Sequence, residues 1–422
     1  MAAADPLSAA ALGVMLSPPI LVLSVNRTAE GGLLTLLAML FAAFWYGLAM
    51  RNSRMACAAL GVPDSIRLEG TVFGPVAAIT VNLASRVLAA LLLMTTLPVA
   101  AGYVFNEMFV YWFPNFGFAF LLLAFLATIQ LVSRRLAQRL QLLLTGAAAV
   151  GMGGVSLAAL YSGSLPTALF LPASFDSLTP LLAGFMALSA CDLAPVSTGR
   201  RGRGCGSTAA LLVAGTLLGL FSVAALSVVP ASRLADSTIP HLLVARGALG
   251  QGGRLFMGAV VIAGSAAAIN GLLLALPVIS GEMATALKVP LSARASTRLR
   301  RVTVAAACAA AAACMAAGVA GSPRISQYLA AAILMWVLRH GFLQLAIVCL
   351  LLARRRGQRP APGGSVGLWL AAVLALTLFS AVAVAAWNWP LLRETGPWMA
   401  AAVGISFALP VVTRRFVRHH SR

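Results

Sequence analysis

The sequence predicts an all-α polytopic membrane protein with twelve transmembrane helices. Its 422 residues are 61% hydrophobic and only 9% charged, whereas soluble domains carry about 25% charged residues. Twelve apolar runs have about the length needed to cross a hydrocarbon layer of about 30 Å, which is roughly 20 residues. The runs cover approximately residues 7–25, 31–50, 72–101, 117–133, 141–161, 178–198, 208–229, 255–280, 302–320, 328–352, 366–386 and 397–413.

The basic residues between the runs predict the orientation in the membrane. The formal net charge is +20, but the basic residues form short clusters in alternate loops. One side holds 22 of them and the other side six, while Arg86 and Arg339 lie inside runs. The positive-inside rule therefore places both termini in the cytoplasm. The alternation also indicates membrane topology rather than binding to nucleic acid.

Other sequence signals define the class of protein. Basic residues are almost all arginine and alanine is abundant, which is typical of a GC-rich bacterial genome, so we expect a bacterial inner-membrane protein. No HExxH, GxSxG or P-loop motif occurs, so we do not expect an enzyme. No cysteine or histidine spacing indicates a metal site, and we expect neither a bound metal nor a cofactor. The outer loop at 230–254 is either a short helix over a vestibule or an ordinary connector.

Two runs contain residues that break a membrane helix. The first run includes Ser17-Pro18-Pro19, and the sixth includes Ser189-Ala190-Cys191-Asp192, with Pro195 just beyond. Proline removes a backbone N–H and clashes with the preceding turn. Two broken helices at matching places in two halves of a chain indicate the binding site of a transporter.

The two breaks also predict the internal organisation of a single domain, 1–422. The first run travels outward and the sixth travels inward, so their breaks are antiparallel. We therefore expect a five-plus-five inverted repeat, with discontinuous helices 1 and 6. The repeats span about 7–161 and 178–352, and two further helices span about 366–413.

Asp192 is the strongest candidate for a site residue. A carboxylate at membrane depth is costly, so it must face protein, water or a ligand. It would hold a cationic substrate group or carry a proton, or it would cap the second half-helix by accepting hydrogen bonds from backbone N–H groups.

Arg86 and Arg339 also lie inside runs. Asn82 and Arg86 are four residues apart and so share a helix face. Because Asp192 is the one acid counted inside the runs, we expect one arginine to be unpaired and to bind a carboxylate of the substrate. The alternative is that one arginine is a permanent structural partner of Asp192.

Serines could supply further oxygen ligands. Ser17 lies in the first break and Ser189 in the second, and Ser265 lies in the eighth run. In membranes, however, a serine hydroxyl more often bonds the backbone of its own helix. With Asn82, Arg86, Arg339 and the two broken segments, these serines complete the predicted substrate-binding set.

Three short motifs resemble the amino acid–polyamine–organocation (APC) superfamily of permeases. Phe73-Gly74-Pro75 opens the third helix, 185–192 matches that family's sixth-helix pattern, and Gly264-Ser265 with Asn270 is similar to its eighth helix. The resemblance covers about 10–350. It implies an amino acid permease, a secondary transporter that works by alternating access.

The chain departs from that family at the first helix. Members usually have a glycine-rich break whose N–H groups hold a substrate carboxylate, and Pro18 and Pro19 remove two such donors. We therefore predict secondary transport of an amino acid or a related small amine-bearing solute, with a proton or another coupling ion. The alternative function is a transport-inactive sensor or a subunit of a membrane complex.

Overall fold

All regular structure in the described part of the chain is helical. The computed structural model describes residues 5–164, 179–193, 203–289, 292–322, 324–356, 364–388, 394 and 396–408. The α-helices are α1 Pro6–Met15, α2 Pro18–Leu60, α3 Ser65–Phe73, α4 Pro75–Asn82, α5 Leu88–Met108, α6 Asn115–Val132, α7 Arg134–Ser162, α8 Thr179–Leu188, α9 Arg203–Val228, α10 Ala231–Ala235, α11 Pro240–Ala286, α12 Ala293–Ala316, α13 Ile325–Arg356 and α14 Gly364–Asn388. Three short segments, η1 Leu83–Val87, η3 Ser189–Leu193 and η4 Val319–Gly321, have π or 3-10 geometry.

The helices confirm a multi-pass, all-α membrane protein. Among the described residues, nine helical segments are long and apolar enough to cross a membrane. Three shorter apolar helices, Pro6–Met15, Pro180–Leu193 and Gly396–Ala408, accompany them. Two of these three contain or adjoin the helix breaks that the sequence predicts. Pro195 lies outside the described residues.

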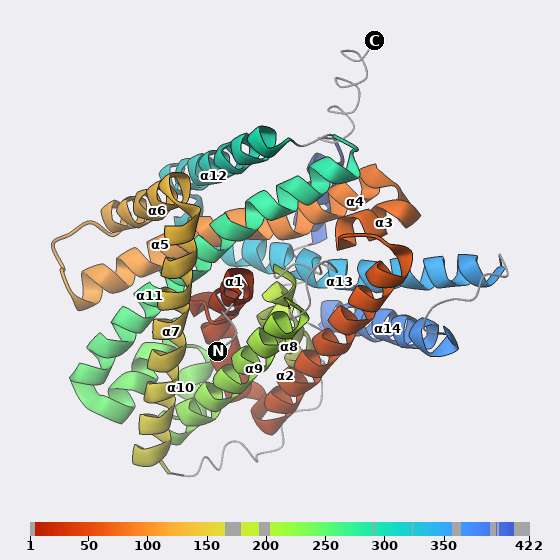
Figure 1. Ribbon diagram of the computed structural model, residues 1–422. Helices are drawn as coiled ribbons and strands as arrows, with labels where there is room; N and C mark the ends of the chain where they lie inside the picture. The colour runs from red at the N-terminus through yellow and green to blue at the C-terminus, as the bar shows by residue number, and fades with distance from the viewer. Residues whose placement is uncertain are drawn as a thin grey trace.

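The first break separates α1 from α2. α1 ends at Met15, Ser17 is extended (φ −66°, ψ 153°), and α2 restarts with prolines in its first turn. Proline suits this position, since the first helical N–H groups have no partner inside the helix. In Figure 1, α1 lies near the middle of the bundle, between α11 and the α2–α9 pair.

Two long helices bend sharply at a glycine. α2 contains Gly32 with φ 54° and α11 contains Gly250 with φ 64°, both in a conformation that favours glycine. At each of these glycines the helix is kinked, so the parts before and after it run in different directions. The part of α11 before Gly250, together with α10, shows that the loop at 230–254 contains short helices.

α3 folds back on α4 across Gly74. Gly74 has φ 85°, and Pro75 begins α4. The Glu69 carboxylate accepts a hydrogen bond from Asn82, thirteen residues later, at 2.7 Å. A straight helix would separate these residues by roughly 20 Å along its axis, at 1.5 Å per residue. The turn at Gly74 therefore brings Glu69 to the C-terminal end of α4.

Buried amides hold α1 against its neighbours. Gln141 and Thr145 of α7 both donate to the Ala9 carbonyl oxygen, at 3.2 and 3.1 Å. Asn270 of α11 donates to the Gln141 side chain at 2.8 Å and accepts from Gln130 at 2.9 Å. In a low-dielectric interior a satisfied network of this kind specifies one packing arrangement. It fixes the short first helix beside the break.

We expect Gly271→Ala to destabilise the protein by about 1–3 kcal/mol, as overpacking does in other cores. A Cβ at Gly271 of α11 would lie 3.0 Å from the Cα and the Cβ of Ala10, so α1 would have to move. Gly281→Ala in the same helix is the control, because a Cβ there meets nothing within 4 Å. Thermal unfolding of both variants in detergent measures the difference. Equal unfolding midpoints would contradict the close approach of α1 and α11.

Candidate functional site: a buried ion network beside two helix breaks

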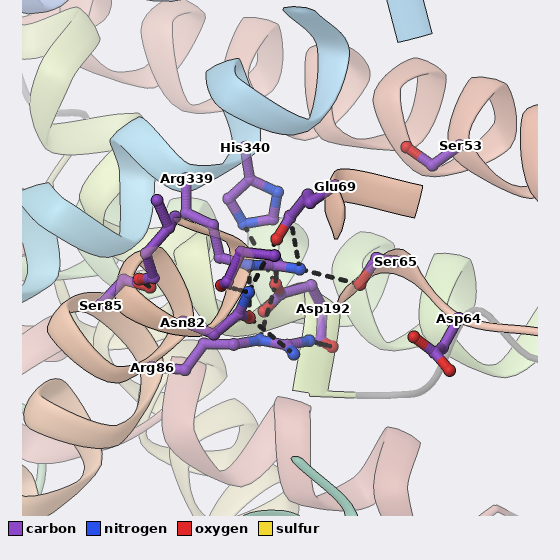
Figure 2. Close-up of polar contacts among 12 residues, drawn as sticks. Ser53, Asp64, Ser65, Glu69, Asn82, Ser85, Arg86, Asp192, Arg339 and His340 are labelled. Atoms are coloured by element: carbon purple, nitrogen blue, oxygen red, sulfur yellow. Dashed lines mark hydrogen bonds and ion pairs between the residues drawn. The ribbon is translucent and has the colours of Figure 1, made fainter. Parts of the chain in front are cut away.

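Asp192 lies at the centre of a buried network of charged side chains. α8 gives way to the 3-10 segment η3 at Ser189, and η3 carries Asp192 into the protein interior. The Asp192 Oδ1 atom accepts from Trp336 Nε1 at 2.9 Å, and its Oδ2 atom accepts from Arg86 Nε at 3.1 Å and from Arg339 Nη1. Figure 2 shows Asp192, Arg86 and Arg339 converging from separate parts of the chain.

Arg339 of α13 is completely enclosed, and each of its three guanidinium nitrogens donates a hydrogen bond. Its guanidinium donates to Asn82 Oδ1 at 2.8 Å and to Ser65 Oγ at 2.8 Å. It also pairs with Asp192 and lies 3.2 Å from Glu69 Oε1. A buried charge is tolerated when it is paired and hydrogen-bonded. Arg339 meets both conditions.

Arg86 lies in η1, a short π-helical segment between α4 and α5. Such segments inside α-helices are frequent at functional sites. Its Nη2 atom donates to the Asp192 carbonyl oxygen at 2.8 Å, and its Nη1 atom donates to Asn82 Oδ1 at 3.4 Å. The Asn82 contact confirms that these two residues share a face. Glu282 of α11 lies 3.9 Å from Arg86, at the edge of the network.

Glu69 is the network residue that the sequence reasoning missed. It is 1% exposed and contacts Arg339 and Asn82. Glu69 precedes the apolar run at 72–101, so the sequence assigns it to the loop between the second and third runs. The available signal was Gly74-Pro75, which marks a helix restart and allows the preceding turn to fold back.

The expectation of an unpaired arginine is therefore wrong. Arg86 and Arg339 both contact Asp192, and Glu69 supplies a second negative charge against Arg339. Two arginines and two carboxylates balance, and Glu282 adds a third carboxylate at the edge. In the described part of the chain, both arginines are structural partners of Asp192. Neither carries an uncompensated charge for a substrate carboxylate.

The backbone capping considered as the alternative for Asp192 would involve residues after Leu193, which lie outside the described part of the chain. The carboxylate contacts of Asp192 in the described residues are with side chains of η1 and α13. His340 lies beside it, 3.8 Å from Oδ2, and its Nε2–H donates to the Ser189 carbonyl oxygen at 3.1 Å. That bond fixes the tautomer, because a carbonyl oxygen can only accept.

The other predicted site residues divide into two groups. Ser189 bonds the Met186 carbonyl oxygen at 3.0 Å within its own helix, and Ala190 and Cys191 are buried beside it. Ser17 and Ser265 are fully buried, and their hydroxyl oxygens have no hydrogen-bond partner in the described structure. Such unpartnered polar groups are rare in proteins and require an explanation.

Ser17 and Ser265 belong to facing elements. The Leu16 carbonyl oxygen lies 3.6 Å from the position that a Cβ would take on Gly264, the neighbour of Ser265. A small cavity on this side of the first break is lined by Leu16, Pro18 and Gly264, among others. The first break therefore faces the middle of α11, while the second break carries Asp192 into the ion network.

A wider cavity opens at the α2–α3 loop, near the ion network. It measures about 590 Å³ and is lined by Arg67, Thr71, Thr285 and Lys288, among others. Asp64, the residue that caps α3, accepts from the Arg67 backbone N–H at 2.8 Å. Burial raises the pKa of Asp64, against the opposing effect of Arg67. Figure 2 shows Asp64 lying apart from the Asp192 network.

Solved structures have a fold similar to that of this chain. No family model and no curated protein matches the sequence. A manganese transporter from Eremococcus coleocola, solved as a histidine-to-alanine variant, matches with TM-score 0.56 and 15% identity over 99% of this chain and 94% of that chain. The same transporter in complex with an aromatic bis-isothiourea compound matches with TM-score 0.56 and 16% identity over the same shares.

These matches correct the assignment to the APC superfamily and the expectation of an amino acid permease. The motifs behind that assignment are short and mark general features of helix packing. Phe73 ends α3, Gly74 has a positive φ, and Pro75 begins α4. Gly264 lies where α11 contacts the Leu16 carbonyl oxygen, which is 3.6 Å from the position of a Cβ on this glycine. The chain has a fold similar to that of a manganese transporter.

Proposed function

We propose that this protein is a secondary transporter that moves a small cation across the inner membrane by alternating access. Twelve transmembrane helices in two inverted halves, with both termini cytoplasmic, are the architecture that we propose for it. Support comes from the two helix breaks and from the fold shared with a manganese transporter. In transporters of this general type, substrates bind at discontinuous helices near the middle of the membrane.

The composition of the first break favours a cation. The Met15 carbonyl oxygen cannot accept from residues three or four positions later, because these are Pro18 and Pro19. The Ser17 and Ser265 hydroxyl oxygens are buried without partners. The break therefore presents oxygen acceptors and lacks two N–H donors. This surplus of acceptors is the observation that carries the proposal, since oxygen ligands suit hard cations.

The ion network supports the same conclusion. An anionic solute would find neither Arg86 nor Arg339 free, because both are occupied by carboxylates. A small cation at the first break would meet no uncompensated positive charge from these two groups. We assign to the network the task of holding η3 to α3, η1 and α13 in the conformation described.

Uptake into proteoliposomes tests the proposed function. We expect the purified protein to accumulate Mn²⁺, or another cation of a panel that includes Mg²⁺ and Na⁺, above protein-free vesicles. An imposed pH gradient tests proton coupling in the same assay. A folded protein that moves none of these cations, in either direction, would contradict the proposal. It would favour the sensor or complex-subunit alternative.

We expect Ser17→Ala with Ser265→Ala to reduce cation uptake by about tenfold or more, because two oxygen ligands are lost. One hydrogen-bond-like contact to a charged group is worth about 1.5–3 kcal/mol, and tenfold corresponds to about 1.4 kcal/mol. Ser24→Ala is the matched control: Ser24 is equally buried, but its hydroxyl bonds the Ile20 carbonyl oxygen at 2.9 Å. Equal rates in all three proteins would remove the first break from the site.

A further inference from the structure

A third cavity, independent of the helix breaks, is lined by arginines without acidic partners in the described residues. It measures about 390 Å³ and lies where the α6–α7 corner meets α11 and the first half of α12. Its lining includes Gln130, Arg134, Ser296, Thr297 and Arg300. None of these residues belongs to the Asp192 network. In Figure 1, α6 and α12 lie together at one edge of the bundle.

Arg300 is held in this cavity by a single backbone contact. Its Nη1 atom donates to the Gln130 carbonyl oxygen at 2.6 Å, in the last turn of α6. The like charges of Arg134 and Arg301 act on it from nearby. The rest of its guanidinium donors have no other protein partner in the described structure. Arg300 is therefore a fixed cation with like charges as neighbours.

No carboxylate in the described residues lies within ion-pair distance of Arg134 or Arg300. The sequence explains this, because α6, α7 and α12 contain seven arginines and not one aspartate or glutamate. The acid nearest in sequence to the lining is Glu282, beside Gly281, but its carboxylate faces Arg86 at 3.9 Å. The positive charge of the cavity is therefore uncompensated.

Exposed apolar side chains on the helices that form the cavity indicate the source of the anion. Val132, Leu136 and Val302 flank the arginines on the same three helices, and they are 76%, 49% and 55% exposed. In a membrane protein such side chains face acyl chains. The arginines also lie on the side that the sequence predicts to be cytoplasmic, where anionic lipids attract basic clusters. Acyl chains and a phosphate group would thus meet at this cavity together.

We infer that this cavity binds the phosphodiester headgroup of an anionic phospholipid, with Arg134 and Arg300 as its ligands. Guanidinium groups match phosphate oxygens in geometry as well as in charge. The lipid would fill the space between the α6–α7 corner and α12 and would supply the missing negative charge. This site is separate from the proposed cation path, so either proposal can fail without the other.

Lipid titration of the full-length protein in detergent tests this inference. Phosphatidylglycerol is added to the wild type and to Arg134→Gln with Arg300→Gln, and binding is followed by native mass spectrometry and thermal shift. We expect about 30-fold weaker binding in the double variant, at about 1 kcal/mol for each arginine. Arg134→Lys with Arg300→Lys should recover part of the loss. The wild type should bind phosphatidylcholine more weakly than phosphatidylglycerol.

Arg135→Gln with Arg298→Gln is the matched control. It removes one arginine from each of the same two helices, with the same change of net charge, and neither residue lines the cavity. Equal losses in the two double variants would show diffuse surface attraction and overturn the site. Undiminished binding in the cavity variant would overturn it as well. Stabilisation by inorganic phosphate and not by phosphatidylglycerol would overturn the lipid assignment.

Discussion

Replacement of Asp192 by asparagine is expected to lower the free energy of unfolding by about 3–5 kcal/mol, which is the cost of breaking a buried ion pair by removing one partner. The substitution keeps the shape of the side chain and removes its charge. Arg339 would then keep Glu69 as its counter-ion at 3.2 Å, and Arg86 would keep only Glu282 at 3.9 Å. The effect should be large because Asp192 and both arginines are at most 6% exposed.

Thermal unfolding in detergent, with size-exclusion profiles of the same samples, measures this effect. Asp236→Asn is the control, since the same chemical change there affects an exposed residue. Adding Arg86→Gln to Asp192→Asn should restore part of the lost stability, because it removes the surplus positive charge. A wild-type unfolding midpoint for Asp192→Asn would show that its charge does not hold the network together.

Arg339 and Glu69 are expected to be strongly coupled in a double-mutant cycle. Arg339→Gln and Glu69→Gln each leave a buried charge with fewer partners, so each should destabilise the protein. The double variant should lose less than the sum of the two, with a coupling energy of about 2–3 kcal/mol, near the top of the usual range for contacting residues. The two groups lie 3.2 Å apart, with side chains at most 2% exposed.

The pair Arg254 and Glu107 supplies the comparison for this cycle. It is also an ion pair between different helices, but its side chains are 25% and 53% exposed. Exposed pairs contribute about 0–1 kcal/mol. We therefore expect a much smaller coupling energy from Arg254→Gln and Glu107→Gln. Similar coupling in the two pairs would contradict the view that enclosure makes the Arg339–Glu69 interaction strong.

The all-helical, multi-pass character of the chain could be predicted because its causes are local. An apolar run of about 20 residues forms a helix in lipid whatever surrounds it, since its backbone groups must be satisfied internally. The first break could be predicted for a similar reason: the consecutive prolines Pro18 and Pro19 remove two backbone donors and clash with the preceding turn in any environment. The pairing of Asn82 with Arg86 followed from helical spacing alone.

The family assignment failed because its motifs also describe local packing. Phe73-Gly74-Pro75 predicts a helix restart, and the structure contains that restart. A restart at this place is required by the fold-back of α3 and does not distinguish one transporter family from another. At 15–16% identity the relation to a manganese transporter was not visible in short motifs, and it emerged from the arrangement of the whole chain.

The sequence by itself determined an all-α membrane protein, the position of the helix break at Ser17-Pro18-Pro19, and three of the charged groups at membrane depth. Only the tertiary structure decided how those charges are paired. Glu69 reaches Arg339 because Gly74 turns α3 back on α4, and Asp192 meets α13 because η3 leaves the line of α8. The physical reason is that Coulomb interactions depend on distance in space and on burial, and 147 residues separate Asp192 from Arg339 along the chain.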